Sequence, residues 1–387
     1  MQELVEGEQE DFLGGRGRYE RRAEGQAGSR NGYERGRLRT AEGPVEVAVP
    51  QVRGAGEPFR SALMGFLEGN SDVLERLVAE MYARGLSTRD IEDAFRDVTG
   101  ELLISRSAVS EITGRLWADY QEFTARDLSE IEVEYLFADA IFESLRRRGA
   151  KEALLVAWCI AADGRKHLLH LAAGNKESQA CWTEFFRNML SRGMRLPATI
   201  TSDGAPGLIN AIQACFPASV RIRCWFHKLA NIRAKLPDET AGEVLAHVYA
   251  VRDAPTLDAA RAAAGQFTNA FGRDYPSAVA CFDDDLDALL ASCRVPVRHR
   301  IRVRTTNLAE RSFEEERRRT KVIPRLMDEK AALKLVFATM VRAAGRWCRV
   351  SVTDLERHQL KLLRAELGLD PPPTTSEPKP RRKAAAA

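Results

Sequence analysis

Residues 153–173 read ALLVAWCIAADGRKHLLHLAA, a pattern that predicts a β-hairpin inside a larger sheet. The ten apolar residues from Ala153 to Ala162 are too few to span a membrane and are typical of a strand that is buried on both faces. Asp163 and Gly164 are a favoured pair for a tight turn. The apolar run from His167 to Ala173 then predicts the returning strand.

Shorter strands and helices flank this hairpin. Residues 135–138 predict a strand that ends at Asp139, and residues 198–201 predict one that ends at Ser202-Asp203-Gly204. Further segments fit helices over 177–192, 206–215 and 225–236 and a strand over 220–224. The first three strands are expected to be antiparallel and the later ones parallel. This order is that of an α/β fold with a ribonuclease H-like mixed sheet.

Two carboxylates stand where the apolar pattern of these strands stops. Active sites of open α/β sheets lie at strand ends, which makes Asp139 and Asp203 candidate site residues. Each also has a purely structural interpretation, because acids are common in loops after strands and an Asp before a Gly is a common turn residue. Asp163, which also precedes a glycine, is assigned to the hairpin turn.

Residues 238–300 are alanine-rich and mostly helical by pattern, which predicts an all-α insertion into the sheet domain. After it, Asn307 suits a helix N-cap with Glu310 in the first turn. Arg317, Arg318 and Arg319 follow on the same helix and suit contacts to phosphates. The alternatives are a capping role for Glu310 and ion pairs between the arginines and the acids at 314–316.

Cys224 and His227 have the residue types and the spacing of half a zinc site. No second pair with this spacing follows nearby, which disfavours a four-ligand structural zinc. His227 is interpreted as an orienting or DNA-contacting residue, and a core histidine is an equal alternative. The tryptophans at 182, 225 and 347 favour core packing over stacking on bases.

The stretch from Arg16 to Thr40 contains eight arginines and three glutamates, with Tyr19 and Tyr33 between them. Such a segment can neutralise phosphates and stack on bases, and a flexible arm with solvated arginines is the alternative. The alternation in residues 45–49 predicts a short strand that Pro50 ends.

Three short helices are expected between residues 72 and 120. An apolar stripe covers 73–83, Gly85 ends that helix, and Ser87 with Asp90 opens a second one over 88–98. Ser105 or Ser107 can cap a third helix. The triplet suits a helix-turn-helix, although helix triplets also form for packing alone.

Composition places the chain among globular proteins. Its 387 residues predict two or three domains, and the net charge of +3 hides 58 basic and 55 acidic residues. The seven scattered cysteines indicate a reducing compartment. With no apolar membrane segment and an acidic first dodecapeptide, a soluble cytoplasmic protein is expected. The Pro-rich end from Pro371 to Ala387 is expected to be disordered.

Several motifs occur together in one order along the chain. They are Tyr19-Glu20-Arg21, Arg30-Asn31-Gly32-Tyr33, Pro50-Gln51-Val52-Arg53, residues 81–90 (MYARGLSTRD), residues 105–110 (SRSAVS), Tyr135-Leu136-Phe137-Ala138-Asp139, Ser202-Asp203-Gly204, Cys224-Trp225-Phe226-His227, residues 305–310 (TTNLAE) and residues 317–321 (RRRTK). Together they make the chain resemble the Mutator-type insertion-sequence transposases of bacteria, which are DDE transposases.

The resemblance implies a ribonuclease H-like core, an all-α insertion before the last acid, and a catalytic triad of Asp139, Asp203 and Glu310. The triad would hold two Mg²⁺ ions, with Mn²⁺ as a substitute, and Asp139 would bridge them. The implied partners are the terminal inverted repeats and target DNA. Synapsis of two ends implies a homo-oligomer, at least a dimer, acting at the nucleoid.

The predicted function is a transposase that binds terminal repeats and catalyses metal-dependent strand cleavage and strand transfer. A catalytically decayed transposase acting as a repressor is the alternative, and a ribonuclease H-type nuclease leaves the helix-turn-helix unexplained.

The expected DNA-contacting residues are Arg30, Tyr33, Arg89, Arg106, Ser107, His227, Arg317, Arg318 and Arg319. The expected regions are a basic segment (1–60), a helix-turn-helix region (61–128), the catalytic core (129–237 and 301–350), the insertion (238–300) and a C-terminal tail (351–387).

Overall fold

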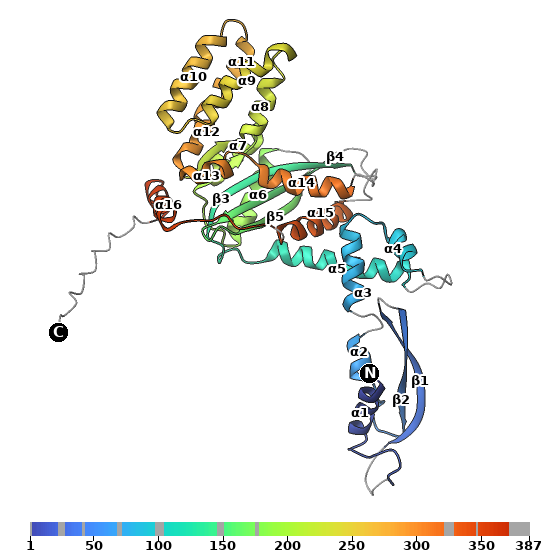
Figure 1. Cartoon of the computed structure of the whole chain (residues 1–387). Coiled ribbons are helices and arrows are strands. Elements are labelled where there is room, and N and C mark those ends of the chain that lie inside the picture. The colour runs from blue at the N-terminus through green and yellow to red at the C-terminus, as the bar shows by residue number, and fades with distance from the viewer. Residues whose placement is uncertain are drawn as a thin grey trace, which may run out of the picture. The chain divides into compact units, whose positions relative to one another are not determined.

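The structure is a computed structural model, and it describes residues 2–21, 28–40, 43–67, 72–96, 104–144, 151–174, 178–320, 329–345 and 347–370. Contacts divide the chain into two compact units, Met1–Asp119 and Tyr120–Ala387. Figure 1 labels the elements of both units along the chain. Among the described residues, no helix combines the length and apolar character needed to cross a bilayer.

The first unit begins with a helix and a long hairpin. Helix α1 (Gln2–Phe12) contacts strand β2 (Gly43–Arg53), which pairs antiparallel with β1 (Ser29–Thr40). Residues 29–40 of the basic stretch therefore form a strand rather than a flexible arm. The prediction that Pro50 ends its strand is wrong, since β2 continues to Arg53. Pro50 lies opposite Tyr33 where the register shifts, and a proline is tolerated at such an irregularity of an edge strand.

The described residues of this unit also form the helices α2 (Ala62–Leu67), α3 (Asp72–Ala83), α4 (Thr88–Ala94) and α5 (Arg106–Ala125), the last of which continues past Asp119. Gly85 follows α3 with a φ of 93°, and Ser87 with Asp90 forms the predicted capping box of α4. The second helix ends at Ala94 rather than Val98, and residues 97–103 lie outside the described residues. Leu74, Ile91 and Val109 belong to one buried apolar cluster that joins α3, α4 and α5.

The second unit is built on a five-stranded mixed sheet with the order β5-β4-β3-β6-β7. The strands are β3 (Val133–Ser144), β4 (Lys151–Ala161), β5 (Lys166–Gly174), β6 (Thr199–Ser202) and β7 (Val220–Arg223). β3, β4 and β5 pair antiparallel, whereas β6 runs parallel to both β3 and β7. The hairpin and the mixed strand directions agree with the sequence prediction.

Strand β3 is longer than predicted, and the prediction that it ends at Asp139 is wrong. Asp139 lies within the strand, opposite Val156 of β4. The apolar pattern stops there because the parallel neighbour β6 pairs only with residues 135–137 of β3. Asp139 therefore lies just beyond the end of β6, and pairing with β4 alone carries β3 onward to Ser144.

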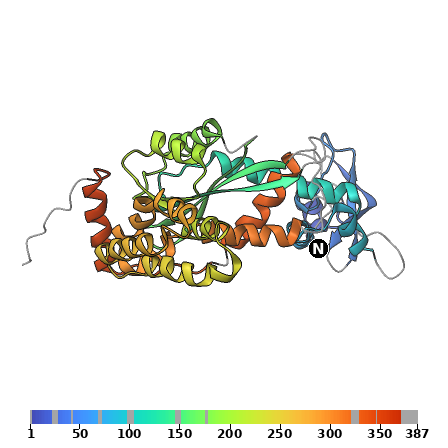
Figure 2. The ribbon, with the colours of Figure 1, turned by 90° about the horizontal axis from the view of Figure 1, so that it is seen from above.

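Helices cover the two faces of the sheet. One face packs against α6 (Gln179–Ser191) and α7 (Pro206–Cys215) through a buried cluster that includes Leu136 and Trp182. The other face is covered by α14 (Asn307–Thr320), which contacts β3 and β4, and by α15 (Glu329–Ala344), which contacts β5. In Figure 2 the light-green helices and the orange helix α14 lie on opposite sides of the green strands.

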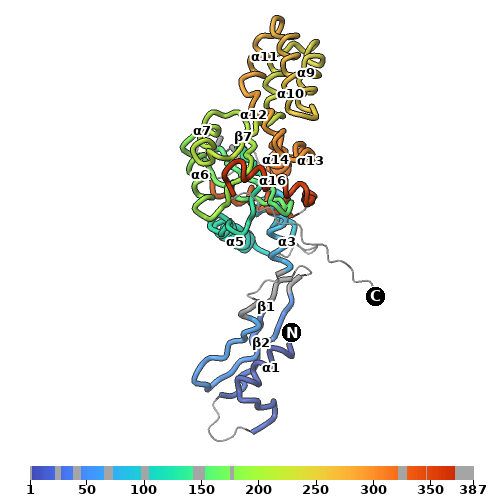
Figure 3. The backbone as a smooth tube through the Cα atoms, turned by 90° about the vertical axis from the view of Figure 1, so that its left-hand side faces the viewer, coloured from blue at the N-terminus to red at the C-terminus, as the bar shows by residue number. Residues whose placement is uncertain are grey.

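An all-helical segment separates α7 and β7 from α14. It comprises α8 (Trp225–Arg233), α9 (Asp238–Arg252), α10 (Leu257–Phe271), α11 (Pro276–Asp283), α12 (Leu286–Leu290), the 3₁₀ turn η1 (Ala291–Arg294) and α13 (Val297–Val303). Its helices share an apolar core of their own, which includes Val248, Phe267 and Phe282. Figure 3 shows α9, α10 and α11 gathered beside one another.

The segment predicted to be a C-terminal tail contains a packed helix. Helix α16 (Asp354–Glu366) begins with a capping box between Thr353 and Glu356, and it buries Leu360 and Leu363. The side chain of Arg364 is 1% exposed and lies 3.7 Å from Glu134 of β3. The expected disorder of residues 371–387 lies outside the described residues.

Candidate active site

Asp139 and Asp203 lie where the parallel strands end. Phe137 of β3 pairs with Thr201 of β6, so Asp139 is two residues past that pair on one strand and Asp203 two residues past it on the next. Asp139 is 7% exposed, and its Oδ1 accepts a hydrogen bond from the N–H of Ala140 at 2.9 Å. The sheet therefore presents both carboxylates at one end of its parallel half.

The loop after Asp203 is held tightly in place. Oδ1 of Asp203 accepts a hydrogen bond from the N–H of Ala205 at 3.0 Å, just before α7 begins at Pro206. A Cβ on Gly204 would lie 2.6 Å from Nη2 of Arg223, whose Nε donates to Asp285 at 3.1 Å. The glycine is required by this close approach of a buried arginine, which the sequence alone does not reveal.

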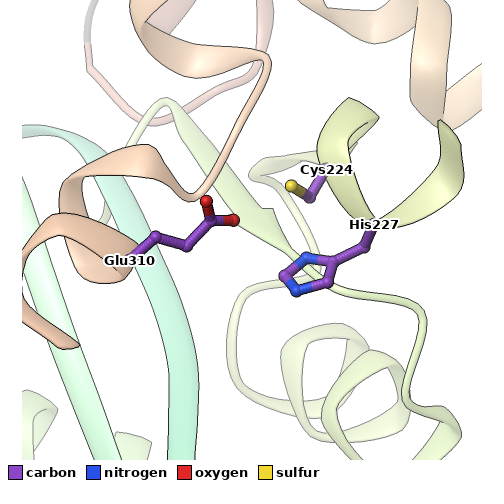
Figure 4. A group of neighbouring side chains, drawn as sticks. All are labelled: Cys224, His227 and Glu310. Carbon is purple, nitrogen blue, oxygen red and sulfur yellow. The ribbon is translucent and has the colours of Figure 1, made fainter. Parts of the chain in front are cut away.

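Glu310 comes from the first turn of α14 and joins residues at the start of α8. Ligand atoms of Cys224, His227 and Glu310 all lie within 4.8 Å of one another. Figure 4 shows the Glu310 carboxylate directed toward His227 and Cys224, which come from another segment of the chain. Residues 86 positions apart are thus brought to the same end of the sheet as the two aspartates.

Thr306 connects the two segments. Its hydroxyl donates to Oε1 of Glu310 at 2.9 Å, and its N–H donates to Sγ of Cys224 at 3.4 Å. The N–H of Trp225 also donates to the carbonyl of Arg304 at 2.9 Å. Thr306 is fully buried and was not predicted as a site residue. It, rather than the predicted Asn307, holds the N-cap position of α14, because its carbonyl accepts a hydrogen bond from the N–H of Glu310 at 2.9 Å.

The charges at this site influence one another. Burial raises the pKa of Asp139 to about 7, His227 lowers it, and the carboxylates of Asp203 and Glu310 raise it further. The neighbouring Cys224, followed by Asp139 and Glu310, raises the pKa of His227 to about 9. These mutual effects place all three acids and His227 in one electrostatic cluster.

The donor set fits hard divalent cations. Asp139, Asp203 and Glu310 supply carboxylate oxygens, the ligands that Mg²⁺ prefers, and no arginine or lysine of the described residues forms an ion pair with any of them. The structure also gives Cys224 and His227 a third potential ligand in Glu310. However, Cys224 is fully buried and its sulfur accepts the Thr306 N–H, which favours a structural role for the thiol.

Of the other predicted contact residues, five belong to the first unit and are described by themselves. Arg89, Arg106 and Ser107 are exposed at the starts of α4 and α5. Arg30 instead donates to the carbonyls of Arg16 and Gly17 and to Gln9, which favours a structural role in the hairpin.

Tyr33, Arg318 and Arg319 already have hydrogen-bond or ion-pair partners within the protein. Tyr33 donates to Glu6. Arg318 and Arg319 pair with Glu315 at 2.9 and 2.6 Å, as the ion-pair alternative proposed. Arg317 is exposed and has no hydrogen-bond or ion-pair partner within the described part of the chain.

Comparison with known proteins identifies relatives over most of the chain. Residues 1–350 match the family model described as Transposase, Mutator family. The chain is 35% identical over 306 residues to the transposase for insertion sequence element IS6120 of Mycolicibacterium smegmatis, a match that covers 77% of this chain and 95% of the relative. It is 30% identical over 370 residues to the transposase for ISRM5 of Rhizobium meliloti, covering 94% and 92%.

A more distant match is the transposase for IS256 in transposon Tn4001 of Staphylococcus aureus, which is 27% identical over 349 residues and covers 89% of this chain and 88% of the relative. Among solved structures, a chain of a simian T-cell lymphotropic virus intasome in complex with PP2A regulatory subunit B56 gamma matches with a TM-score of 0.18 and 10% identity. That match covers 47% of this chain and 69% of that chain, an overlap too weak to carry an argument.

Proposed function

Because the chain belongs to the Mutator family of transposases, we propose that it binds the terminal repeats of an insertion sequence and catalyses metal-dependent cleavage and strand transfer of DNA. The observation that carries this proposal is the convergence of Asp139, Asp203 and Glu310. They come from three separate segments and meet at one end of the sheet without a basic ion-pair partner among the described residues.

The sheet supports assignment to the ribonuclease H-like folds. Its order β5-β4-β3-β6-β7, with only β4 antiparallel to its neighbours, is the order expected for such a fold. In this assignment the all-helical segment that ends at Val303 is an insertion before the last acid. Asp139, Asp203 and Glu310 then correspond to the DDE triad of the family.

The three carboxylates would hold two Mg²⁺ ions, with Mn²⁺ as a substitute. Such ions, when bound, activate the attacking water or 3′-hydroxyl and stabilise the leaving oxygen of the phosphodiester. Asp139 contributes a carboxylate whose pKa is raised to about 7, first by burial and further by the charges of Asp203 and Glu310. Thr306 orients Glu310 through its hydroxyl. His227, whose raised pKa favours the imidazolium, would contact a substrate phosphate.

The first unit supplies candidate surfaces for the terminal repeats. The cluster formed by α3, α4 and α5 supports a helix-turn-helix in which the exposed Arg89, Arg106 and Ser107 contact DNA. Of Arg317, Arg318 and Arg319, Arg317 is best placed to contact a phosphate, since Arg318 and Arg319 are already paired. Joining both ends of an element implies at least a dimer on DNA, acting at the nucleoid.

Variants that keep the shape of each acid test the proposal. Asp139→Asn, Asp203→Asn and Glu310→Gln are each expected to abolish Mg²⁺-dependent strand transfer of a labelled terminal-repeat duplex while leaving binding of that duplex unchanged. Arg294→Ala, which removes an ion pair with Glu366 on the surface, is the matched control and should remain active. Strand transfer by any of the three variants would refute the triad. The non-catalytic alternative predicts binding without nicking by the unmutated chain, and no feature of the site favours it.

A further inference from the structure

We infer that Lys166, Arg302 and Arg311 form a binding site for consecutive phosphates of a DNA duplex, on the face of the sheet covered by α14. This inference rests on the proposed function and names a surface that would hold the DNA along α14, which carries Glu310, toward the end of the sheet marked by Tyr135. The three residues, here called the basic cluster, come from β5, α13 and α14 and were not singled out by any sequence pattern.

Strand register places Lys166 on this face. Directly opposed residues of antiparallel strands project to the same side, and Tyr135, Ile160 and Lys166 oppose one another across β3, β4 and β5. Tyr135 identifies the side, because its hydroxyl lies 2.6 Å from Nδ1 of His299 on α13. Arg302 follows His299 by three residues and so lies on the neighbouring part of the same helix surface.

Arg311 reaches the cluster from α14. The next residue, Ser312, accepts a hydrogen bond from Nε1 of Trp158 at 3.2 Å, and the ring of Trp158 lies 4.6 Å from that of Trp347. Nζ of Lys166 lies 6.0 Å from the Trp347 ring. Arg302 and Arg311 are close enough to Lys166 to lower its pKa, in addition to the larger effect of burial.

Within the described part of the chain, the basic cluster has no counter-charge of its own. None of its three cations has an ion pair or a side-chain hydrogen bond among the described residues. Asp163, the acid of the adjacent hairpin turn, already pairs with Arg165 and Arg349 at 3.3 and 3.5 Å. Like charges gathered in this way repel one another, and a run of phosphates would remove the repulsion.

The position of the basic cluster suits DNA held for reaction at the triad. Arg311 is the residue after Glu310, so the two Cα atoms are about 3.8 Å apart. Arg302 and Arg311 are exposed and Lys166 is half-buried, which leaves their charged groups accessible to a backbone passing over α13 and α14. A duplex bound here would bring one of its phosphodiesters toward the carboxylates.

Salt-dependent binding tests the assignment. The triple variant Lys166→Ala/Arg302→Ala/Arg311→Ala and the unmutated chain are titrated with a labelled 20-bp random-sequence duplex in EDTA. Each lost phosphate contact should reduce the slope of log K against log [salt] by about 0.9, and affinity at 0.1 M salt should fall roughly 10²-fold. Retention of both slope and affinity would overturn the inference.

Two controls separate charge from shape. The charge-preserving variant Lys166→Arg/Arg302→Lys/Arg311→Lys should bind with the unmutated slope, as should Arg294→Ala. Loss of binding by the charge-preserving variant would overturn the inference, as would stronger displacement of the labelled DNA by duplex RNA of equal length than by unlabelled DNA. Since EDTA removes divalent ions, this test is independent of the triad. If the assignment of the triad is wrong, only the proposed chemistry is lost and binding in EDTA is unaffected. If the assignment of the basic cluster is wrong, strand transfer by the carboxylates is unaffected.

Discussion

Glu134 and Asp139 are buried carboxylates on the same strand, β3, with opposite surroundings. Glu134 is 5% exposed and lies 3.7 Å from the guanidinium of Arg364, which also pairs with Asp370. Asp139 is 7% exposed and has no such partner among the described residues. Burial raises the pKa of both acids; Arg364 lowers that of Glu134, whereas for Asp139 His227 lowers the pKa and two further acids raise it. A similar pairing holds Asp285 against Arg221, Arg223 and Lys228.

The two acids differ in their ion pairs: an arginine of the chain faces Glu134, whereas Asp139 has no basic ion-pair partner among the described residues. A buried acid without a partner is unfavourable unless something external supplies positive charge. At the amino-terminal end of β3 an arginine of the chain faces the acid, whereas at the end that carries Asp139 we propose that bound cations supply positive charge beside His227. Removing the partner of Glu134 at one end and adding a cation at the other should therefore change the stability of the protein in different ways.

The largest effect is expected from removing the arginine. Arg364→Met leaves Glu134 buried without its partner and should lower the free energy of unfolding by about 3–5 kcal/mol, measured by urea denaturation. The double variant Arg364→Met/Glu134→Gln should recover part of this loss, because the uncompensated charge is then gone. A double variant as unstable as the single one would show that Arg364 acts through packing or Asp370 instead.

A divalent cation should stabilise the opposite end. At a Mg²⁺ concentration of 100 times the dissociation constant, binding to the folded state adds about 2.7 kcal/mol to its stability, seen as a rise in Tm. Asp139→Asn should remove most of this rise, and Glu134→Gln should leave it unchanged. An equal rise in the Asp139→Asn variant would place the cation elsewhere.

The sequence predicts the Asp139 end of β3 better than the Glu134 end. The hairpin of 153–173 and the acids Asp139, Asp203 and Glu310 follow from apolar runs and motifs, because both depend on local pattern. The partners of Glu134 do not follow. Helix α16 lies in a stretch predicted to be a tail, and the pairing of Arg364 with Glu134 joins residues 230 positions apart.

The true length of β3 and the role of Thr306 were missed for a related reason. Residues 140–144 continue the strand because β4 remains beside them after β6 has ended, which is a property of the sheet and not of the segment. Thr306 is a site residue only because the starts of α8 and α14 meet. Tertiary contacts of this kind leave no periodic signal in a single sequence.

Thr306 allows a test of how the triad is oriented. Thr306→Val removes the hydroxyl that donates to Glu310 and should reduce the rate of strand transfer about 10- to 100-fold, the range found for groups that orient metal ligands. Thr306→Ser keeps the donor and should retain most of the rate. The readout that separates orientation from folding is the Mg²⁺ dependence, because the valine variant should need more Mg²⁺ at an unchanged Tm in EDTA. Equal rates for the two variants would remove Thr306 from the site.

The smallest effect concerns the stability of the metal-free protein, and it should be larger at the Asp139 end of β3 than at the Glu134 end. In EDTA at pH 8, Asp139→Asn removes a carboxylate whose pKa is raised to about 7. The free energy of unfolding should therefore increase, by about 1 kcal/mol for each pKa unit by which the carboxyl group lies above its ordinary value. Burial also raises the pKa of Glu134, but Arg364 and Arg195 lower it, so Glu134→Gln should increase the free energy of unfolding by less than Asp139→Asn does. The sign for Asp139 holds because a buried acid with a raised pKa favours the protonated folded state and penalises the ionised one above that pKa. A loss of stability in Asp139→Asn would mean that the aspartate is satisfied within the fold, and the case for cations at this end of the sheet would fall with it.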